Sequence, residues 1–507
     1  MDSHHAIVQE ISFQVKRFYA DKKPFYIYHG STNSTRASKK SRSNTVDTSR
    51  LNRVLCIDRV RKVALVEPNV PMDMLVQATL PQGLIPPVVM DFPGITVGGG
   101  FAGTSGESSS YRHGFFDRTV NWIEIVIGNG EVLKASATEH PDLFFGAACS
   151  FGTLGITTLV ELQLLGLPAE PVVELTYVPI SKGVNEAVRI IEELTPDAAY
   201  QYIDGIMFSK DRGVICAGAI KSRAATAAVR MQTFAHPTDP WFYMHVEQLL
   251  SSSTSGTGPV KELVPLVDYL FRYDRGGFWV GKYGFQYFLF PQTEFMRWLL
   301  DDVIRTRVMY HAVHKSGLFR EYTIQDVAVP YAAAEQLIDY LDDSFGKYPL
   351  WLCPVRQTTA HVRGLIARRR TGFEAEHAPD MMLSVGVWGP GPKGKTQFLD
   401  FNRRLEKLVR ALGGEKWLYA RTWYTDSEFW SIYDRSQMDE LRERYHAGYL
   451  PNLYHKVCAE RGETAIAKQG WVPWLMEKVF QQWPICGVYG LIHTFWNKEY
   501  LLDDSKK

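Results

Sequence analysis

The sequence has few cysteines and no long apolar run, and each shortage excludes a class of protein. The six cysteines among the 507 residues form no C-x-x-C pair, which argues against a zinc site and a disulfide framework and favours a reducing compartment. The chain does not start with a charged-then-apolar signal pattern. No run of about 18 apolar residues occurs, so we expect no transmembrane helix and an intracellular location.

An excess of charge of one sign is also lacking. The formal net charge is +1, so no bulk field attracts nucleic acid and we expect no nucleic-acid partner. The length suffices for two or three domains. Aromatic residues are abundant, with 13 Trp and 25 Tyr, which suits stacking surfaces or an apolar ligand cavity.

The stretch 94–110 is rich in glycine, serine and threonine. Its residues Gly98, Gly100 and Gly103 fit G-x-G-x-x-G, but no amphipathic helix follows the third glycine, so we reject a Rossmann site. Glycines let a ligand approach the backbone, and successive N–H and hydroxyl groups form an anion-binding concavity. The stretch therefore predicts a loop that holds a diphosphate. A flexible linker fits poorly, because apolar runs flank the stretch closely.

Two further small-residue loops lie beside expected strands. Residues 29–35 follow a strand at 25–28, and residues 149–156 precede an apolar strand that runs to residue 165. One nucleotide with two phosphates would be held by all three loops together. Their combination is a stronger signal than any one of them.

The remaining pattern predicts alternating helices and strands. Residues 36–50 are basic and polar, and we expect an exposed loop there. The segments 237–245 and 271–287 are aromatic-rich and are expected to be partly core and partly cavity lining. Clear periodicity predicts helices at 6–20, 72–80 and 184–194, and strands at 54–58, 62–67, 122–127, 131–135, 172–178, 202–208 and 213–220.

Several segments in order resemble the Δ24-sterol reductase (Diminuto) family, which belongs to the vanillyl-alcohol-oxidase flavoproteins. The resemblance covers roughly residues 10–460, and its narrowest signals are Pro240-Trp241-Phe242 and Trp351-Leu352-Cys353-Pro354. It implies an α+β fold with two domains, a PCMH-type FAD-binding domain and an antiparallel-sheet cap. The implied divisions are 1–165 for the first part of the FAD domain, 166–400 for the cap, 401–460 for the part that completes the FAD domain, and 461–507 for a Trp-rich extension.

The three loops and the resemblance together supply the expected FAD-binding residues. We expect noncovalent FAD, because neither His29 nor His113 lies where a histidine tether is usual in this superfamily. The residues are His29, Gly30, Ser31, Thr32, Asn33, Ser34, Thr96, Val97, Gly98, Gly99, Gly100, Phe101, Ala102, Gly103, Thr104, Ser105, Gly106, Glu107, Ser108, Ser109, Ser110, Gly152, Thr153, Gly155 and Ile156.

A flavin carries hydride chemistry that side chains lack, and reduction of a double bond also needs a proton donor. Aromatic and polar residues group in 417–433, so we expect the donor there. The candidates are Tyr419, Tyr424 and Glu428, with Arg421 and Lys282 as charge-supplying neighbours.

Two motifs are rejected as decoys. Residues 389–396 fit G-x-x-x-x-G-K-[ST], but Pro390 and Pro392 lack the N–H groups that a phosphate cradle needs. His311 and His314 have no third ligand or neighbouring Glu, so no metal site is expected.

The resemblance implies reduction of a carbon–carbon double bond in a sterol or terpenoid, with NADPH as the electron source. An oxidase or cyclase acting on a polyene stays open, as does a lipid-binding protein with a vestigial flavin site. The family's usual N-terminal membrane anchor is not expected here. Residues 471–496 carry several tryptophans, and either contact with the endoplasmic reticulum membrane or packing on protein would use them.

Overall fold

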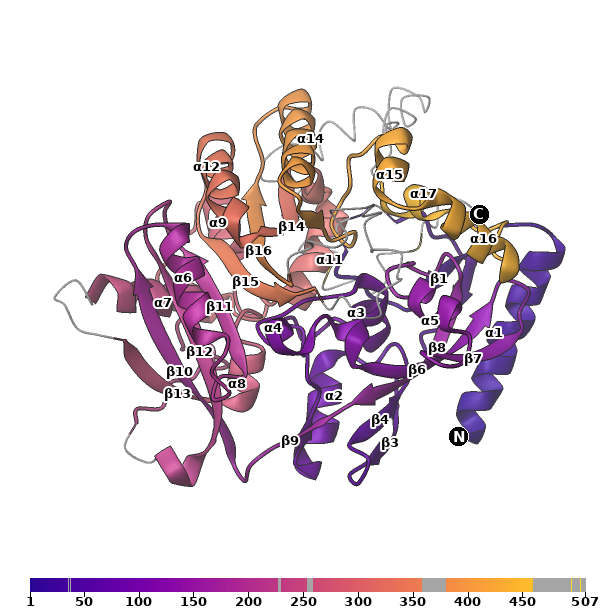
Figure 1. Cartoon of the computed structure of the whole chain (residues 1–507), viewed down its shortest axis with the longest axis horizontal. Coiled ribbons are helices and arrows are strands. Elements are labelled where there is room, and N and C mark those ends of the chain that lie inside the picture. The colour runs from indigo at the N-terminus through magenta and orange to yellow at the C-terminus, as the bar shows by residue number, and fades with distance from the viewer. Residues whose placement is uncertain are drawn as a thin grey trace.

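The structure, a computed structural model, describes residues 1–34, 36, 38–226, 229–252, 259–357 and 380–458, with residues 494 and 502. Two halves, each built on an antiparallel sheet, face each other across the middle of the molecule (Figure 1). Helices cover the sheets, as expected when each sheet must bury an apolar face. The expected α+β fold is confirmed.

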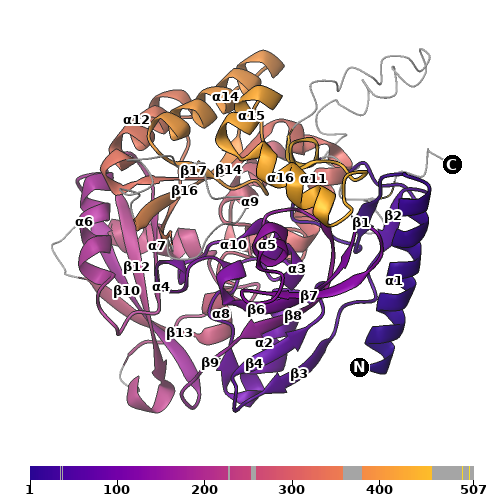
Figure 2. The ribbon, with the colours of Figure 1, turned by 45° about the vertical axis from the view of Figure 1, so that its right-hand side comes forward.

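The first half contains a five-stranded sheet in the order β3-β4-β8-β6-β7. The N-terminal helix α1 lies along this half (Figure 2), where His4 is buried 2.9 Å from Glu67 and 3.1 Å from Glu124. The strands are β1 (Tyr26–Tyr28), β2 (Thr45–Asp47), β3 (Val54–Asp58), β4 (Val63–Val66), β5 (Leu84–Ile85), β6 (Val120–Ile127), β7 (Val132–Ser136), β8 (Gly155–Gln163) and β9 (Leu165–Gly166), and the helices are α1 (Asp2–Ala20), α2 (Met72–Thr79), α3 (Val97–Gly103), α4 (Ser110–His113) and α5 (Pro141–Ala147).

The glycine-rich stretch is not a loop throughout, because Val97–Gly103 forms helix α3. Thr96 caps this helix by accepting a hydrogen bond from the Gly99 N–H, while Val97 and Phe101, four residues apart, are buried in the core. The N–H groups of Gly98 and Gly100 donate to the carbonyls of Pro68 and Thr96. The prediction of successive free N–H groups is therefore wrong for these two glycines.

The second half contains an eight-stranded sheet in the order β13-β10-β12-β11-β15-β16-β14-β17. Helices α6, α12 and α14 cover its outer face with apolar residues at helical spacing (Figure 1). The strands are β10 (Pro171–Ile180), β11 (Tyr202–Met207), β12 (Gly213–Ser222), β13 (Val260–Pro265), β14 (Tyr322–Pro330), β15 (Leu350–Arg356), β16 (Met381–Pro390) and β17 (Glu415–Lys416), and the helices are α6 (Val184–Leu194), α7 (Phe242–Ser252), α8 (Leu266–Leu270), α9 (Val280–Tyr287), α10 (Glu294–Leu299), α11 (Thr306–Ser316), α12 (Ala334–Ser344) and α14 (Lys395–Ala411).

Strand alternation gives the larger sheet two different faces. Val327, Leu352 and Val385 point to the outer helices, whereas their neighbours on the same strands point inward. Asp326 and Trp351 are both paired in register with Gly386 of the strand between them. A side chain at Gly386 would meet Asp326 and Trp351 at 3.1 Å each, so glycine leaves room for this inward row.

The C-terminal segment returns to the first half. Helices α15 (Asp426–Ile432), α16 (Arg435–Arg444) and α17 (Leu453–Val457) follow β17, and Tyr449 on this segment donates a hydrogen bond to the Gly128 carbonyl at 2.8 Å. The expected division at residue 400 falls inside α14, and the larger sheet continues to Lys416. The expected extension 461–507 lies outside the described residues, apart from residues 494 and 502.

Candidate functional site

A cavity of about 370 Å³ lies between the two halves. Its walls come from the small-residue segments of the first half, the inward face of β14, β15 and β16, and residues 419–420 and 455–456 near the C-terminal end of the described chain. This volume is within the range of small-molecule sites. The cavity thus joins segments that are far apart in the sequence.

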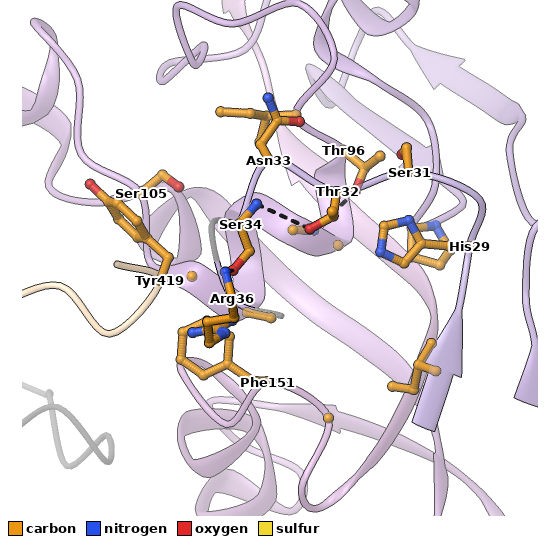
Figure 3. Close-up of a pocket in the computed structure, with 18 of the residues that line it drawn as sticks. His29, Ser31, Thr32, Asn33, Ser34, Arg36, Thr96, Ser105, Phe151 and Tyr419 are labelled. Carbon is orange, nitrogen blue, oxygen red and sulfur yellow. Dashed lines mark hydrogen bonds between the residues drawn. The ribbon is translucent and has the colours of Figure 1, made fainter. Parts of the chain in front are cut away.

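All three small-residue segments reach the cavity, as Figure 3 shows for the first two. Loops beside strands position them, because the first follows β1 and the third precedes β8. The expected flavin residues that line the cavity are His29, Ser31, Thr32, Asn33, Ser34, Thr96, Gly98, Gly99, Ala102, Gly103, Ser105, Gly106, Glu107, Gly152, Gly155 and Ile156.

The other expected flavin residues have structural roles beside the cavity. Gly100 packs so closely on Met90 that an added Cβ would lie 2.4 Å from the methionine methyl. The Ser108 hydroxyl is 3.4 Å from the Tyr269 hydroxyl, and the Thr153 hydroxyl donates to the Ser150 carbonyl at 2.8 Å. The residues that do not line the cavity are Gly30, Val97, Gly100, Phe101, Thr104, Ser108, Ser109, Ser110 and Thr153.

The first loop is held in shape by its own side chains (Figure 3). The Ser34 N–H donates to the Thr32 hydroxyl at 3.0 Å, and the Arg36 N–H donates to the Ser34 hydroxyl at 3.3 Å. Within the described part of the chain, His29 Nδ1 and Asn33 Nδ2 are buried without a hydrogen-bond partner. Burial lowers the pKa of His29 to about 3, so its ring is neutral. Because buried polar atoms are normally paired, these two are free to bind a ligand.

This end of the cavity is basic, which the sequence did not suggest. Arg36, Lys39, Lys40 and Lys456 line it, although residues 36–50 were expected to be an exposed loop. The Arg36 guanidinium donates to the Leu418 carbonyl at 2.6 Å. Burial, with repulsion from Lys40, Arg36 and Lys39, lowers the pKa of Lys456 to about 7. A half-buried group of cations beside unpaired nitrogen atoms is suited to a phosphate-bearing ligand.

Another part of the cavity wall, which we call the aromatic end, is lined by aromatic rings. Phe92, Phe278 and Trp388 form a triangle with ring centroids 5.2 to 5.7 Å apart. Trp351 lies 5.6 Å from Phe278, and Tyr310 lies 6.1 Å from Phe92. All five line the cavity, so this wall excludes water and favours an apolar ligand.

One acid and one tyrosine are paired in this aromatic end. The Tyr419 hydroxyl donates to Asp326 Oδ2 at 2.9 Å, and Trp388 Nε1 donates to Oδ1 at 3.4 Å. Burial raises the pKa of Asp326 to about 6 despite these hydrogen bonds. Burial and the Asp326 charge hold the pKa of Tyr419 well above its usual value. The carboxyl of this pair therefore gains or loses its proton closer to neutral pH than an ordinary aspartate does, beside a tyrosine hydroxyl that keeps its proton.

A second acidic group links the two halves. Asp91 and Glu107 line the cavity, and the Asp91 N–H donates to Glu107 Oε1 at 3.2 Å. Buried Arg272 binds Asp91 at 2.9 Å and Asp204 of β11 at 2.8 Å. Burial and the neighbouring Asp91 raise the pKa of Glu107 well above its ordinary value.

Of the five expected catalytic residues, the structure brings only Tyr419 to the cavity. Glu428 closes the capping box of α15 and pairs with Arg403 at 3.0 Å. The Arg421 guanidinium lies 4.5 Å above the Trp423 ring. Tyr424 lines a small pocket with residues 409–416 instead. Lys282 is on α9 and is not part of the cavity wall.

Sequence reasoning missed Asp326 as a site residue, although Gln325-Asp326-Val327 was part of the resemblance. The strand periodicity could have indicated it, because a lone acid on the inward face of an apolar strand is rarely buried without a role. Lys456 gave no such signal, since its cavity partners lie more than 400 residues away in the sequence.

Neither decoy motif gives a site in the described residues. The segment 389–396 spans the end of β16 and the start of α14 and does not line the cavity. His314 instead bonds the Ser34 carbonyl at 2.5 Å, so α11 supports the first loop. The described chain holds no group of three or more His, Cys, Asp or Glu arranged for a metal ion. None of its helices is long and apolar enough to cross a bilayer.

The comparisons with known proteins agree with this geometry. The FAD binding domain family matches residues 6–136, which include the first two loops. The chain is similar to the Delta(24)-sterol reductase of Homo sapiens, with 26% identity over 472 residues, 90% of this chain and 86% of that protein. It is also similar to the Delta(24)-sterol reductase of Arabidopsis thaliana, with 28% identity over 451 residues, 82% of this chain and 77% of that protein.

The fold and the matched domain define an FAD-binding protein of two sheets with a cavity between them. Within that class the chain is similar to the Δ24-sterol reductases across most of its length. The resemblance expected from the motifs is confirmed.

Proposed function

We propose that the protein is an FAD-dependent oxidoreductase that reduces a carbon–carbon double bond in a sterol or terpenoid lipid, with NADPH as electron donor. The observation that carries the proposal is the division of one cavity into a basic end with unpaired donors and an aromatic end with a paired acid and tyrosine. The names of the relatives support the substrate class. NADPH rests on the family resemblance alone.

The residues present fit FAD. Buried, unpaired His29 Nδ1 and Asn33 Nδ2 and the cations Arg36 and Lys456 would hold its diphosphate. Gly103 lines the cavity beside Tyr419, and an added Cβ there would be in ordinary van der Waals contact with the tyrosine ring, 3.6 Å away. When bound, the flavin would supply hydride to the substrate.

The chain's own part in the reaction would be to supply the proton and exclude water. With Asp326 protonated, Tyr419 is free to donate its proton into the cavity and recover one from the carboxylic acid. The aromatic wall would fix the apolar substrate in a dry environment. We propose the pair Asp326 and Tyr419 as the proton source, in place of the wider group expected in 417–433.

The proposal is tested on the purified full chain. The expected results are a flavin spectrum that acid precipitation releases into the supernatant, bleaching on anaerobic addition of NADPH, and a product two hydrogens heavier from a Δ24-unsaturated sterol. Rapid reduction of the flavin by a saturated lipid in the absence of NADPH would favour an oxidase instead. A colourless protein that takes up no added FAD would overturn the proposal.

We also propose that the flavin-binding unit comprises residues 1–165 with the segment after β17, and that residues 166–416 form the cap. Return of α16 to the first half supports this division, since the Tyr445 hydroxyl donates to Asp142 of α5 at 2.8 Å. A location on the cytoplasmic side, peripheral to the endoplasmic reticulum membrane, would suit a lipid substrate. Fractionation of cells expressing the chain tests the location.

A further inference from the structure

An unusual apolar surface lies at the end of α9 and on α10, away from the cavity wall. Twelve large apolar residues of the described chain are exposed, and five of them fall within eleven residues. These five form what we call the α10 patch: Leu289 at 73% exposure, Phe290 at 41%, Phe295 at 63%, Trp298 at 50% and Leu299 at 55%. Exposed apolar residues are ordinary when scattered, whereas a contiguous group marks a contact surface.

Helix α10 departs from a soluble helix's pattern at three exposed apolar positions, although Met296 packs against the core. Its Arg297 is buried, with Nη1 donating to the Gln292 carbonyl at 3.0 Å, while Phe295, Trp298 and Leu299 face outward. A helix on the surface of a water-soluble protein buries its apolar side and exposes its charges. The exposed rings and the leucine therefore leave apolar surface in contact with water.

The turn before α10 presents its apolar tip in a strained conformation. Leu289 has a φ of +57°, in a region that favours glycine or asparagine over leucine. The Phe290 N–H donates to the Phe285 carbonyl at 2.9 Å, which fixes the turn. A leucine kept at such a position, 73% exposed, indicates a role for the side chain outside the fold.

The patch is connected rigidly to the cavity wall. Trp279 sits between them, buried, and its Nε1 donates to the Trp388 carbonyl at 2.9 Å. Ring contacts with centroids 5.5 to 6.5 Å apart run without a break from the wall to the patch, through Phe278, Trp279, Tyr243, Trp241, Phe285 and Phe290. The patch is therefore built onto the same aromatic core as the proposed lipid site.

We propose that the α10 patch docks the protein on the surface of a lipid bilayer, by insertion of Leu289, Phe295, Trp298 and Leu299 into the interface. The composition fits, because tryptophan and phenylalanine sit at headgroup level and apolar tips enter the acyl region. The occupant follows from the proposed function, on which this inference rests: a water-insoluble substrate is dissolved in the bilayer. Residues 287–307 carry three acidic and three basic side chains, so docking is driven by apolar insertion and not by anionic lipid.

The test measures flotation of the full-length protein with vesicles of pure phosphatidylcholine. Combined substitution Phe295→Ser, Trp298→Ser and Leu299→Ser is expected to weaken partitioning by at least about tenfold. Leu289→Asn removes the apolar tip at a φ that asparagine tolerates and is expected to weaken it by severalfold without loss of folding. The matched control is Phe13→Ser on α1, where a phenylalanine is 64% exposed in the other half, and it is expected to bind as the wild type does.

The depth to which the α10 patch inserts into the bilayer is measured from the quenching of tryptophan fluorescence by brominated phosphatidylcholine. Trp298→Phe keeps an apolar ring, so it is expected to float normally and to lose part of the quenching. Vesicles of equal parts phosphatidylcholine and phosphatidylserine are expected to bind within about twofold of the pure vesicles, because the patch carries no net charge.

Three results would overturn the inference. They are equal flotation of the triple variant and Phe13→Ser, loss of flotation only on removal of residues 461–507, and a change from dimer to monomer in the triple variant with flotation unchanged. Bleaching of the flavin by NADPH is measured on the same samples. Bleaching without flotation would contradict the membrane docking alone. Flotation without bleaching would contradict the proposed function alone.

Discussion

The two ends of the cavity differ in every property that decides what they bind. One end has Arg36 and Lys456 beside the unpaired donors of His29 and Asn33, and the other has Asp326 and Tyr419 within an aromatic wall. A ligand with a charged and a flat portion, such as FAD, would place its charged portion at the basic end and leave part of the aromatic end for an apolar partner. One cavity thus separates the proposed binding of a diphosphate from the proposed proton donation, because its two ends come from different parts of the chain.

The largest effect is expected from breaking the aromatic end. Tyr419→Phe should lower turnover by about 10²–10⁴-fold with the flavin absorbance retained, because it removes the proposed proton donor only. Turnover of the wild type should fall as pH rises through about 6, since the active form is protonated Asp326. Turnover and bound flavin are measured on the same samples.

Tyr424→Phe is the matched control for that change, since its ring lies outside the cavity. Full activity in Tyr419→Phe, or equal losses in both variants, would remove the assigned proton source. Loss of flavin from Tyr419→Phe would mean that the aromatic end also contributes to flavin binding.

A smaller effect is expected from the basic end. Lys456→Met should weaken FAD binding by about tenfold at pH 6, through loss of one charge-assisted hydrogen bond. In the wild type, binding a phosphate should require the charged lysine, whose pKa is lowered to about 7. Affinity should therefore fall above pH 7 by about tenfold in all, to the level of the variant, and the variant should lack this dependence.

Stability of the flavin-free protein should change with pH in the opposite direction. The unfolded chain binds the Lys456 proton up to about 10.5 and the folded chain only to about 7, so unfolding takes up a proton between these values. The free energy of unfolding should rise with pH in that window. Calorimetry compares the wild type with Lys456→Met, and the exposed Arg59→Met is the control. A flat affinity profile in the wild type would contradict the assignment.

The smallest effect is expected from Trp388→Phe, which sharpens the comparison within the aromatic end. The indole donates a long hydrogen bond of 3.4 Å to Asp326, and its loss should raise the pKa of that carboxyl. The pH limit of turnover should move upward by less than one unit, with about a twofold change in rate at pH 6. A downward shift would show that the carboxyl is not the titrating group.

Much of the fold followed from periodicity, and the departures have physical reasons. The apolar spacing of residues 184–194 gave α6 with its bounds, and the alternation at 213–220 gave most of β12. Helix α3 was missed because glycine has low helix propensity, which the Thr96 cap and the burial of Val97 and Phe101 override.

The site was predictable only in part. Small-residue loops beside strands signal a phosphate site locally, so the three segments could be found. The basic end forms because the fold brings Arg36 next to Lys456. The position of Asp326 in the cavity wall depends on which face of β14 points inward. Neither is a local property, and a charged run such as 36–40 has the composition of an exposed loop.

Arg272 has a consequence for how a ligand arrives. Its guanidinium is 1% exposed and ties Asp91 of the flavin-binding half to Asp204 of the cap. Pulling the halves apart would break one of these two ion pairs, which hold the halves together. We therefore expect no hinge opening of the two halves during turnover. Reactants should enter and leave through an opening of the cavity while the halves stay in contact.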